Sequence, residues 1–419
     1  MEKKSKNTWK LPLEGIVILD NSWVIAGPHG TRLLADLGAT VVKIETCRNK
    51  DIIRLDYLRY GVKDGLEEAG WVFQENNRNK MGLRLNLKSE QGKQIYAKLV
   101  EKADVVVSNV TPKAIRSMGI DYETLHAINP RIISVNASGL GDFGCKKDTM
   151  IFAPLLNAFT GLSYTVGYDG QPGYGLGSST AANVGGAMVA MSILMALEAR
   201  DRTGEGQFVD LSEAENMLGV LGASLLEWGY NHAQTGPVGN HAYFSPACPH
   251  NAYRGAGVDS WIVIACGDDE EWNRFVAFAG REVPALKDSG FATCRQRKER
   301  EAELDELIAG YVRKHNHREL AYKLQEAGVS ASAVERPEET LANEQLNARG
   351  FWIKAGLPER DPRQPDFLIC ADVPKTMPRE ERVMKPSPAL GEDNDYILKE
   401  MLGLSDAQIQ AATEDEAFY

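Results

Sequence analysis

Asp169 is the acidic residue whose surroundings could support covalent chemistry. It lies in the stretch TVGYDGQPG, residues 165–173, where three glycines and a proline predict a tight turn. A carboxylate in such a turn either shapes the backbone or acts as a nucleophile toward an activated carbonyl group. Because Asp-Gly and Pro-Gly are common turn dipeptides, the stretch taken alone favours the first role.

Five basic residues could bind a phosphorylated ligand. They lie near the ends of the first predicted strands, and ligands of open α/β sheets bind beyond the carboxyl ends of the strands. The alternative is a charged face in contact with solvent, and the sequence leaves both interpretations open. The residues are Lys43, Arg48, Arg54, Arg78 and Lys80.

Several familiar catalytic and binding motifs are missing from the sequence. The first βα turn, NSWVIAGP, lacks the G-x-G-x-x-G pattern, so NAD binding is not predicted. The sequence has no C-x-x-C, no H-E-x-x-H, no G-x-S-x-G and no P-loop. Of the seven histidines, His241 and His250 lie in a glycine-rich stretch and are the two that could contact a ligand.

Composition narrows the class of protein. The chain has 419 residues and a net charge of −11, so broad nucleic-acid binding is not expected. Six widely spaced cysteines fit a reduced, cytoplasmic protein. There is no hydrophobic signal core and no run of about 18 apolar residues, so we expect no membrane span. The most apolar stretch, 181–199, is predicted to be a buried core helix.

Strands alternate with helices over the first half of the chain. Such alternation predicts a doubly wound parallel sheet, and it is this sheet that must position the basic residues. The predicted strands are 15–20, 40–45, 83–87, 103–109, 131–138 and 207–212; the predicted helices begin at Pro28, 89, 112, 122 and 180.

The pattern changes after residue 230. A stretch rich in glycine, proline and histidine predicts an extended crossing, and a compact α+β region follows it. That region is predicted to hold strands 260–266 and 330–335 and helices 269–279, 299–314 and 318–326. The tail from 337 contains several prolines and ends in a helical segment at about 393–412.

Taken together, blocks of this sequence resemble the class III CoA-transferases, of which formyl-CoA transferase is a familiar member. LPLEGIVILDNSWVIAGPHGTRLLADLGATVVKIE is similar to the opening of that family, and NRNKMGLRLNLKSEQGKQIYAKLVEKADVVVSNVTP is similar to its next block. GIDYETLHAINPRIISVNASGLG, ALEARDRTGEGQFVDLSEAE, ARGFW and PALGEDNDYIL follow in the expected order. The resemblance covers nearly the whole chain.

The resemblance implies a nucleophilic role for Asp169. The family carries its nucleophile in a T-G-x-x-D-G-x-P context, and TVGYDGQP is similar. It implies CoA transfer between an acyl-CoA and a free acid through an aspartyl-CoA thioester. Coenzyme A would be a substrate, and neither a metal nor a redox cofactor would be needed.

The resemblance also implies residues that contact CoA. The family arginine after the fourth strand would fall on Ser117, so its neighbour Arg116 is taken in its place. Ser138 stands where some members have lysine, and formyl-CoA transferase's run of glycines has no counterpart here. The expected CoA-contacting residues are Val24, Ala26, Arg48, Asn79, Lys80, Asn109 and Arg116.

The fold implied by the resemblance is a Rossmann-like large domain and a smaller α+β domain, joined by long linkers in an interlocked dimer. The expected large domain spans 9–225 and is completed by 385–419. A linker at 226–258 leads to the small domain at 259–336, and 337–384 forms the return linker.

Two alternative functions are retained. Some related transferases are hetero-oligomers, and this chain could be a structural or weakly active subunit of such an enzyme, of the benzylsuccinate type. The α-methylacyl-CoA racemases are also similar, but their acid and base positions would fall on Phe152, Ala153 and Ala182, which cannot titrate. A homodimer, or a heteromer with a related subunit, is the expected assembly.

The substrate acid is expected to be larger than oxalate or formate. Apolar side chains in the first turn and near Asp169 favour a larger, even aromatic, acid over a small dicarboxylate, as in benzylsuccinate-type transferases with succinyl-CoA as donor. The same side chains could equally be core. They are Trp23, Ile25, Phe152, Phe159, Tyr164 and Tyr168.

Overall fold

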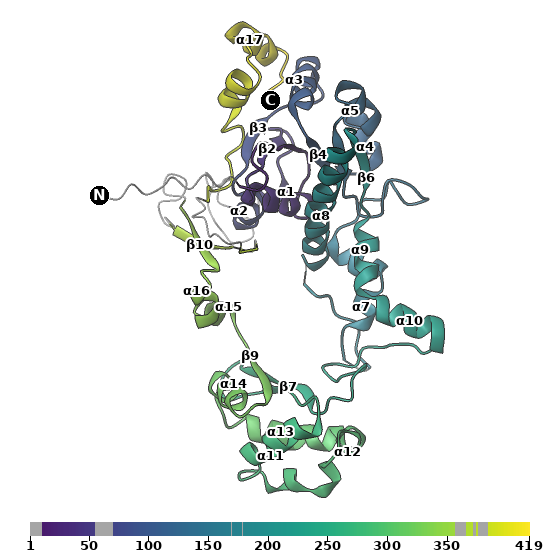
Figure 1. The fold of residues 1–419 in the computed structure, drawn as a ribbon, viewed down its shortest axis with the longest axis vertical. Helices are drawn as coiled ribbons and strands as arrows, with labels where there is room; N and C mark the ends of the chain where they lie inside the picture. The colour runs from purple at the N-terminus through teal and green to yellow at the C-terminus, as the bar shows by residue number, and fades with distance from the viewer. Residues whose placement is uncertain are drawn as a thin grey trace, which may run out of the picture. The chain divides into compact units, whose positions relative to one another are not determined.

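The computed structural model describes residues 11–54, 70–168, 170–177, 179–356, 366–371, 374–375 and 384–419. The chain divides into two compact units (Figure 1). Unit 1 comprises Met1–Leu162, Gly175–Tyr230 and Gly350–Tyr419. Unit 2 comprises Ser163–Tyr174 and Asn231–Arg349, so the segment that contains the turn around position 169 belongs to the smaller unit.

Unit 1 is built on a six-stranded parallel sheet in the order β3-β2-β1-β4-β5-β6. This is the strand order of a Rossmann-like doubly wound fold, and it confirms the predicted fold class. The strands are β1 (Val17–Asp20), β2 (Thr40–Glu45), β3 (Met81–Arg84), β4 (Val105–Ser108), β5 (Ile133–Asn136) and β6 (Gln207–Asp210).

Helices cover both faces of this sheet because successive strand residues point to opposite sides. Ile18 packs on the side of α1 (Ala26–Asp36) and α8 (Thr180–Thr203), and Leu19 packs on the side of α3 (Glu90–Lys102). The remaining helices of unit 1 are α2 (Trp71–Asn77), α4 (Pro112–Met118), α5 (Tyr122–Ile128), α6 (Ala153–Phe159), α9 (Glu213–Val220), α10 (Gly222–Asn231) and α17 (Asp406–Glu414).

Glycines let α1 and α8 approach closely. A methyl group at Gly30 would lie 2.6 Å from the Gly186 carbonyl oxygen and 2.7 Å from Val189. Of the described residues, α8 is the one helix whose length and composition would allow it to cross a membrane. Its buried residues instead pack against α1 and the sheet, in agreement with the predicted core helix.

The C-terminal segment completes unit 1 by covering the edge strand β3. The Gly82 and Arg84 N–H groups donate to the side chains of Asp393 and Asn394, over 2.7 and 2.8 Å. The π-helix η4 (Tyr396–Met401) and α17 then pack into the core on the α3 side. An edge strand that would otherwise expose unpaired backbone groups is thus capped by the end of the same chain.

Unit 2 contains a three-stranded antiparallel sheet in the order β7-β8-β9. Ile262 and Ile264 face the helices that cover one side, whereas Trp261 and Val263 lie on the other side and are partly exposed. Its elements are α7 (Leu162–Thr165, which begins at the last residue of unit 1), β7 (His250–Arg254), β8 (Trp261–Ala265), α11 (Asp269–Ala279), η2 (Pro284–Lys287), η3 (Ser289–Phe291), α12 (Cys294–Glu299), α13 (Glu301–Val312), α14 (His317–Glu326), β9 (Ser330–Val334), α15 (Pro337–Leu341) and α16 (Glu344–Ala348).

Two stretches expected to be linkers contain regular structure. β7 lies within 226–258, where the glycine and proline content predicted an extended crossing. Within 337–384, α15 and α16 are followed by an antiparallel pair, β10 (Trp352–Gly356) and β11 (Asp366–Cys370). β7 forms because pairing with β8 satisfies its backbone groups, which the local composition does not reveal. The linker boundaries themselves remain a prediction.

Candidate active site

The turn after β1 is held in an unusual backbone conformation. Val24 has φ of +65°, which is costly for a β-branched residue, by about 1–3 kcal/mol. Its N–H group donates to both carboxylate oxygens of Asp51, over 3.0 and 3.2 Å. The following residues enter α1, where Ala26 is buried. Asp51 therefore fixes the backbone at Val24, one of the residues that the family resemblance expects to contact CoA.

Asn109, which follows β4, holds the same turn through two hydrogen bonds to its backbone. Its side-chain oxygen accepts a hydrogen bond from the Trp23 N–H group over 2.8 Å, and its side-chain nitrogen donates to the Trp23 carbonyl over 2.7 Å. A side chain at Gly27 would collide with Ser22 and contact Asn109. The expected residues Val24, Ala26 and Asn109 are thus brought together at the carboxyl ends of β1 and β4.

Lys80 lies beneath this turn as part of a buried charge network. Its ammonium donates to Asp20 Oδ2 over 2.8 Å, to the Pro28 carbonyl over 2.9 Å and to Asn77 Oδ1 over 2.8 Å. Burial lowers the pKa of Lys80 to about 8, against the opposing effect of the Asp20 carboxylate. Burial also opposes ionisation of Asp20, but Lys80 and Lys43 outweigh it and hold the pKa of Asp20 below its usual range.

For four of the five basic residues, the structure contradicts both interpretations that the sequence left open, a phosphate-binding site and a solvated charged face. Lys43, Lys80, Arg54 and Arg78 are buried and paired with acidic residues, so they form neither a solvated face nor an open ligand site. Arg54 pairs with Glu45 over 2.6 Å, and Arg78 pairs with Asp36 over 2.7 Å. Sequence spacing could not reveal this, because the acidic partners follow from packing.

Asn79 anchors a distant segment of the chain. It has φ of +62°, and its side-chain nitrogen donates to Asp36 Oδ1 over 2.6 Å. Its side-chain oxygen accepts the N–H of Lys385 over 2.7 Å. Asn79 and Lys80 precede β3, whereas Arg48 and Asn109 follow β2 and β4, so the expected CoA residues do not all lie at one edge of the sheet.

Arg48 differs from the other basic residues because it lines an open cavity. The cavity has a volume of about 470 Å³ and lies beyond the carboxyl ends of β1, β2 and β3. Trp23, Arg48, the α3 cap Ser89 and the last residue, Tyr419, contribute to its walls. The Arg48 side chain is 63% exposed, pairs with Glu416 over 3.1 Å and lies 5.2 Å from the centre of the Tyr419 ring.

The last turn of α4 also reaches this region. Met118 lines the cavity, and Arg116 on the same turn is exposed. Burial raises the pKa of Asp142, and the charge of Arg116 acts against that increase. The Ser117 hydroxyl donates to the Ala114 carbonyl within its own helix over 2.7 Å. Arg116 is therefore free to turn toward solvent, whereas Ser117 is used locally.

Asp169 itself lies outside the described residues, but its neighbours form the predicted turn. The Gln171 N–H donates to the Tyr168 carbonyl over 3.0 Å, and the Tyr174 N–H donates to the Val166 carbonyl over 2.8 Å. Gly170 has φ of +70°, which a side chain would disfavour. The glycine pattern was therefore a correct signal for the local backbone.

Glu213 is a notable acid that the sequence reasoning did not single out. It begins α9 and is buried, and its side chain lies against Gly185 of α8 beside Ala26. Burial raises the pKa of Glu213 to about 8. Among the described residues none forms an ion pair with it. Its position after the helix cap Ser212 suggested only an ordinary first-turn acid.

The aromatic side chains that precede position 169 in the sequence are largely not core. Within unit 1, Phe152 and Phe159 are exposed, and within unit 2, Tyr164 and Tyr168 are exposed. Trp23 lines the 470 Å³ cavity. Of the two roles left open by the sequence, the structure excludes simple core packing for these four exposed rings within their own units.

Comparison with known sequences decides the family. The sequence profile of CoA-transferase family III matches residues 13–394. The chain belongs to CoA-transferase family III. The match confirms the resemblance drawn from the sequence blocks, and the enzyme therefore transfers CoA.

The relatives of this family III CoA-transferase carry consistent names. A "Probable CoA-transferase" from Mycobacterium tuberculosis is 31% identical over 94% of this chain, which spans only 49% of that relative. The succinyl-CoA–D-citramalate CoA-transferase of Chloroflexus aurantiacus is 30% identical over 96% of this chain and 97% of its own length. The beta subunit of succinyl-CoA–L-malate CoA-transferase from the same organism is 27% identical over 96% and 97%.

A solved structure supports the fold of this CoA-transferase. The crystal structure of a CaiB/BaiF family protein from Brucella suis matches with a TM-score of 0.82 and 26% sequence identity. The match covers 94% of this chain and all of that protein. The fold of this chain is therefore shared with a protein of known structure.

Proposed function

We propose that this CoA-transferase moves CoA between an acyl-CoA and a free carboxylic acid through a thioester on Asp169. The observation that carries the proposal is the family match over residues 13–394 together with the glycine turn formed by the described neighbours of position 169. Asp169 is the acid of this turn, and the family resemblance assigns the nucleophile to this position.

The proposed reaction proceeds by exchange at carbonyl carbons. The Asp169 carboxylate attacks the thioester carbonyl, which forms a mixed anhydride and releases the CoA thiolate. The thiolate attacks the aspartyl carbonyl of the anhydride, which releases the donor acid as a carboxylate and leaves aspartyl-CoA. The acceptor carboxylate then attacks aspartyl-CoA, and the same two steps run in reverse. Every bond broken is matched by one formed, so no oxidant or reductant is required.

The cavity at the carboxyl edge of the sheet is the proposed site for the nucleotide end of CoA. Arg48 supplies the positive charge, and Trp23 supplies an apolar wall. The Arg48–Glu416 pair is exposed on both sides, so a phosphate group can replace Glu416 at little cost. Val24, Ala26 and Asn109 shape the turn beside the cavity, and Arg116 lies within reach of solvent on α4.

Asn79 and Lys80 take a different part in this proposal. Their polar atoms are occupied by Asp20, Asp36 and Lys385, so they act by positioning the turn and the C-terminal segment rather than by offering a free charge. The proposed roles for CoA contact therefore concentrate on Arg48, with the backbone around Val24 and Ala26.

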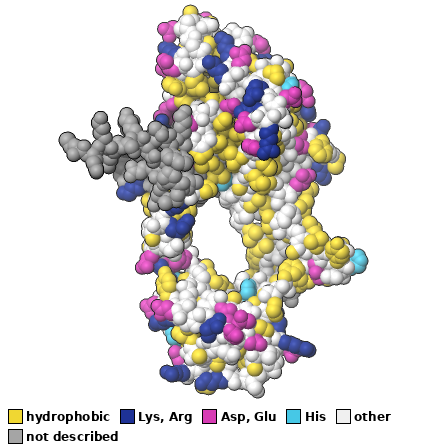
Figure 2. All heavy atoms as spheres, in the orientation of Figure 1, with side chains coloured by type: hydrophobic (Ala, Val, Ile, Leu, Met, Phe, Trp, Pro, Cys, Tyr) yellow, Lys and Arg dark blue, Asp and Glu magenta, His cyan; other side chains and the backbone are white. Residues whose placement is uncertain are grey.

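A second copy of the chain is the proposed partner. Unit 1 exposes a series of large apolar side chains, which Figure 2 shows as hydrophobic surface over α8, α9 and α10. Exposed apolar patches of this kind mark protein interfaces. They include Met191, Leu194, Met195, Val220, Leu225, Leu226 and Trp228. The alternative is a heteromer, because one relative is named as a beta subunit. The cytoplasm is the proposed location.

The substrate pair remains a proposal as well. The named relatives use succinyl-CoA with citramalate or malate, so succinyl-CoA is the first donor to test. The exposed rings of Phe152 and Phe159 support an acid larger than oxalate. A single-subunit enzyme predicts that the purified chain exchanges CoA without help; the structural-subunit alternative predicts that it does so only with a second protein.

Intact-protein mass spectrometry tests the proposal. The chain is incubated with succinyl-CoA, acetyl-CoA and other acyl-CoAs, beside Asp169→Asn and the control Asp201→Asn, which changes an exposed acid on α8. We expect a CoA-sized adduct on the wild-type chain and on the Asp201→Asn control. Hydroxylamine should remove this adduct, and Asp169→Asn should not form it. An adduct that survives in Asp169→Asn would refute the assignment of the nucleophile.

A further inference from the structure

Glu213 is a buried acid that no described residue of its own chain binds. It is only 8% exposed, and its side chain forms neither a hydrogen bond nor an ion pair with the residues that the structure describes. Acidic side chains are rarely buried in this way, because a polar group removed from water costs free energy that only a new hydrogen bond restores. An unpartnered carboxyl group of this kind needs a partner from outside the chain.

The carboxyl group lies beside the turn that follows β1. A methyl group at Gly185 of α8 would lie 3.3 Å from Glu213 Cγ and 3.5 Å from both its carboxyl carbon and Ala26 Cβ. Glu213 and Ala26 are therefore close together across a position that holds no side chain. The Glu213 N–H donates to the Ser138 carbonyl over 3.0 Å, which ties the start of α9 to the loop after β5. Glu213 thus lies at the carboxyl edge of the large sheet.

Two amide side chains on the neighbouring helices also lack partners. Asn216 is one turn further along α9, on the side of the helix that carries Glu213, and its buried Nδ2 makes no hydrogen bond with the described residues. The helix α6 packs against both α8 and α9. The side-chain oxygen and nitrogen of Asn157, buried on α6, are likewise unpartnered within the described chain. Water or a ligand is therefore needed to complete the hydrogen bonding of α6 and α9.

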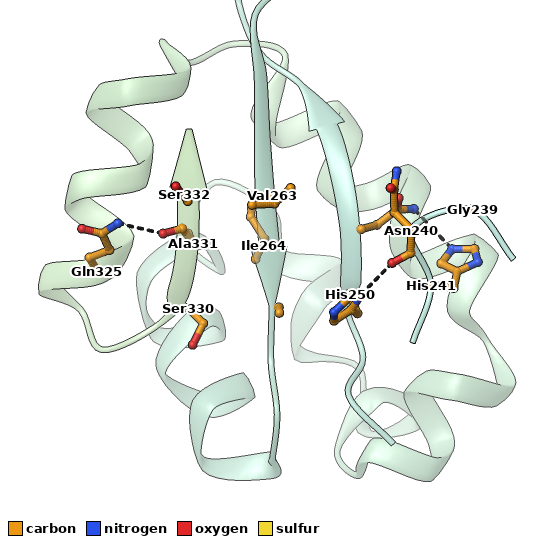
Figure 3. Close-up of a pocket in the computed structure, with 12 residues that line it drawn as sticks. Gly239, Asn240, His241, His250, Val263, Ile264, Gln325, Ser330, Ala331 and Ser332 are labelled. Atoms are coloured by element: carbon orange, nitrogen blue, oxygen red, sulfur yellow. Dashed lines mark hydrogen bonds between the residues drawn. The ribbon is translucent and has the colours of Figure 1, made fainter. Parts of the chain in front are cut away.

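The cleft on the sheet of unit 2 does not share this property. Figure 3 shows the residues that line it, and its volume is about 680 Å³. His241 Nε2 lies 2.8 Å from Asp305 Oδ2, and His250 Nδ1 lies 2.6 Å from the Asn240 carbonyl oxygen. Both imidazoles are thus held by other residues of the same unit, whereas Glu213 has no such partner among the described residues.

The first turn connects the cavity at the carboxyl edge with Glu213. Trp23 lines that cavity, Val24 holds the turn in its unusual conformation, and Ala26 lies beside Glu213. A ligand whose nucleotide end occupies the cavity, and which extends along this turn, therefore reaches the Glu213 carboxyl group. In CoA, the part that follows the nucleotide is the pantetheine arm, a flexible chain that contains amide groups.

We propose that Glu213 contacts the pantetheine arm of CoA and forms a reciprocal pair of hydrogen bonds with one of its amide groups. This rests on the proposed function, which places the nucleotide end of CoA in the cavity lined by Arg48. An amide offers an N–H beside a C=O, and an uncharged carboxyl group offers the matching O–H and C=O. A carboxylate offers acceptors only. Burial raises the pKa of Glu213 to about 8, so the matching form is the main one at pH 7.

The contact is pH-dependent because Glu213 loses its donor when it ionises. Burial alone is the cause of its raised pKa, so no neighbouring charge contributes. The helix α6 has no titratable residue, and α8 carries its charged residues in its last two turns, away from Gly185. The titratable residues on the other surrounding elements are His29, Arg32 and Asp36 on α1, Glu215 on α9, and Asp142 and Asp210 near the ends of β5 and β6.

Calorimetric binding to the Asp169→Asn chain tests the contact without the covalent step. The ligands are acetyl-CoA and adenosine 3′,5′-bisphosphate, which resembles the nucleotide end of CoA but has no arm. Glu213→Gln keeps a donor beside an acceptor, whereas Glu213→Met keeps the length of the side chain and removes both. Glu215→Met is the matched control, because Glu215 is an exposed acid on the same helix.

A loss confined to the arm is the expected result. At pH 7, Glu213→Met should raise the Kd of acetyl-CoA about tenfold or more and change the Kd of the bisphosphate less than about twofold. Glu213→Gln and Glu215→Met should bind both ligands as the Asp169→Asn chain does. An unchanged Kd of acetyl-CoA in Glu213→Met would overturn the proposal. Equal losses for both ligands would also overturn it, because they would indicate a structural defect at the start of α9.

The pH profile provides a second test. With a pKa of about 8, the carboxyl group is protonated in about nine-tenths of the chains at pH 7 and about one-tenth at pH 9. The Kd of acetyl-CoA, relative to that of the bisphosphate, should therefore rise about tenfold over this interval and stay constant in Glu213→Gln. Parallel profiles for the two proteins would contradict the proposed pair.

These measurements separate the Glu213 contact from the chemistry of Asp169. If the mass-spectrometric experiment yields no adduct while the arm-selective loss persists, the nucleophile is refuted and the contact stands. If Glu213→Met, with Asp169 intact, forms the adduct at the same acyl-CoA concentrations as the wild-type chain, the contact is refuted and the nucleophile stands.

Discussion

Glu213 offers the most direct test of the energetics of unit 1. Its carboxyl group is buried between α9 and α8, and burial raises its pKa from 4.5 to about 8. The folded chain therefore holds this proton between pH 4.5 and 8, where the unfolded chain has released it. Stability contributed by this group is present below pH 4.5, falls as the pH rises to about 8, and is constant above that value.

The size of the effect follows from the same pKa values. At about 1.4 kcal/mol per pH unit, the free energy of unfolding falls by about 5 kcal/mol over this interval, which is an upper limit because water can reach a strained buried charge. Glu213→Gln keeps the shape of the side chain and removes the charge. We expect the variant to equal the unmodified chain near pH 5 and to exceed it by several kcal/mol at pH 8 to 9.

Urea denaturation followed by tryptophan fluorescence at pH 5, 6, 7, 8 and 9 provides the measurement. Glu215→Gln is the matched control, because Glu215 lies two residues away on the same helix and is exposed. Other titrating groups act equally in all three proteins, so they cancel in the difference. If the curves of Glu213→Gln and the unmodified chain run parallel across this range, the buried carboxyl is charged and the reasoning is wrong.

Three further predictions concern the cavity lined by Arg48, the buried charge network and the contact between α1 and α8. Arg48→Ala should raise KM for acyl-CoA about tenfold or more with little change in kcat, as measured by steady-state kinetics. Glu416→Gln removes the ion-pair partner of Arg48 and should not raise KM. An unchanged KM in Arg48→Ala would exclude this cavity as the binding site for CoA. Lys80→Met should lower the free energy of unfolding by about 3–5 kcal/mol, because Asp20 loses its partner; a loss below about 1 kcal/mol in urea denaturation would contradict this. Gly30→Ala should destabilise by about 1–3 kcal/mol, whereas Gly219→Ala on α9 meets open space and should not; equal thermal midpoints would argue against the close α1–α8 contact.

Much of the architecture could be predicted because it depends on local patterns of apolar, glycine and proline residues in the sequence. Alternation of apolar strands with helices predicted the parallel sheet, and the glycine and proline content of 165–173 predicted the turn that the described neighbours of Asp169 adopt. The blocks shared with the family predicted CoA transfer, and the family match confirmed it. These signals depend on residues that are close together in the sequence.

Sequence patterns were least informative for charged and histidine side chains. Lys43, Arg54, Arg78 and Lys80 were equally compatible with a ligand site and with a solvated face, and the structure places them in buried ion pairs. Whether a basic residue is available to a ligand depends on its acidic partner, and Lys80 and its partner Asp20 are 60 residues apart. Arg48 resembles the others in sequence yet lines an open cavity.

Tertiary structure also creates groupings of side chains that the sequence does not reveal. His241 and Asp305 are 64 residues apart, and only the packing of α13 against β7 brings Asp305 to Asn251, Tyr253 and the His241 ring. Glu213 looked like an ordinary first-turn acid until α8 and α1 enclosed it. A sequence determines which elements form, because backbone hydrogen bonding and apolar periodicity are local. Packing alone determines which charges lose water, because desolvation depends on every chain segment that surrounds the group.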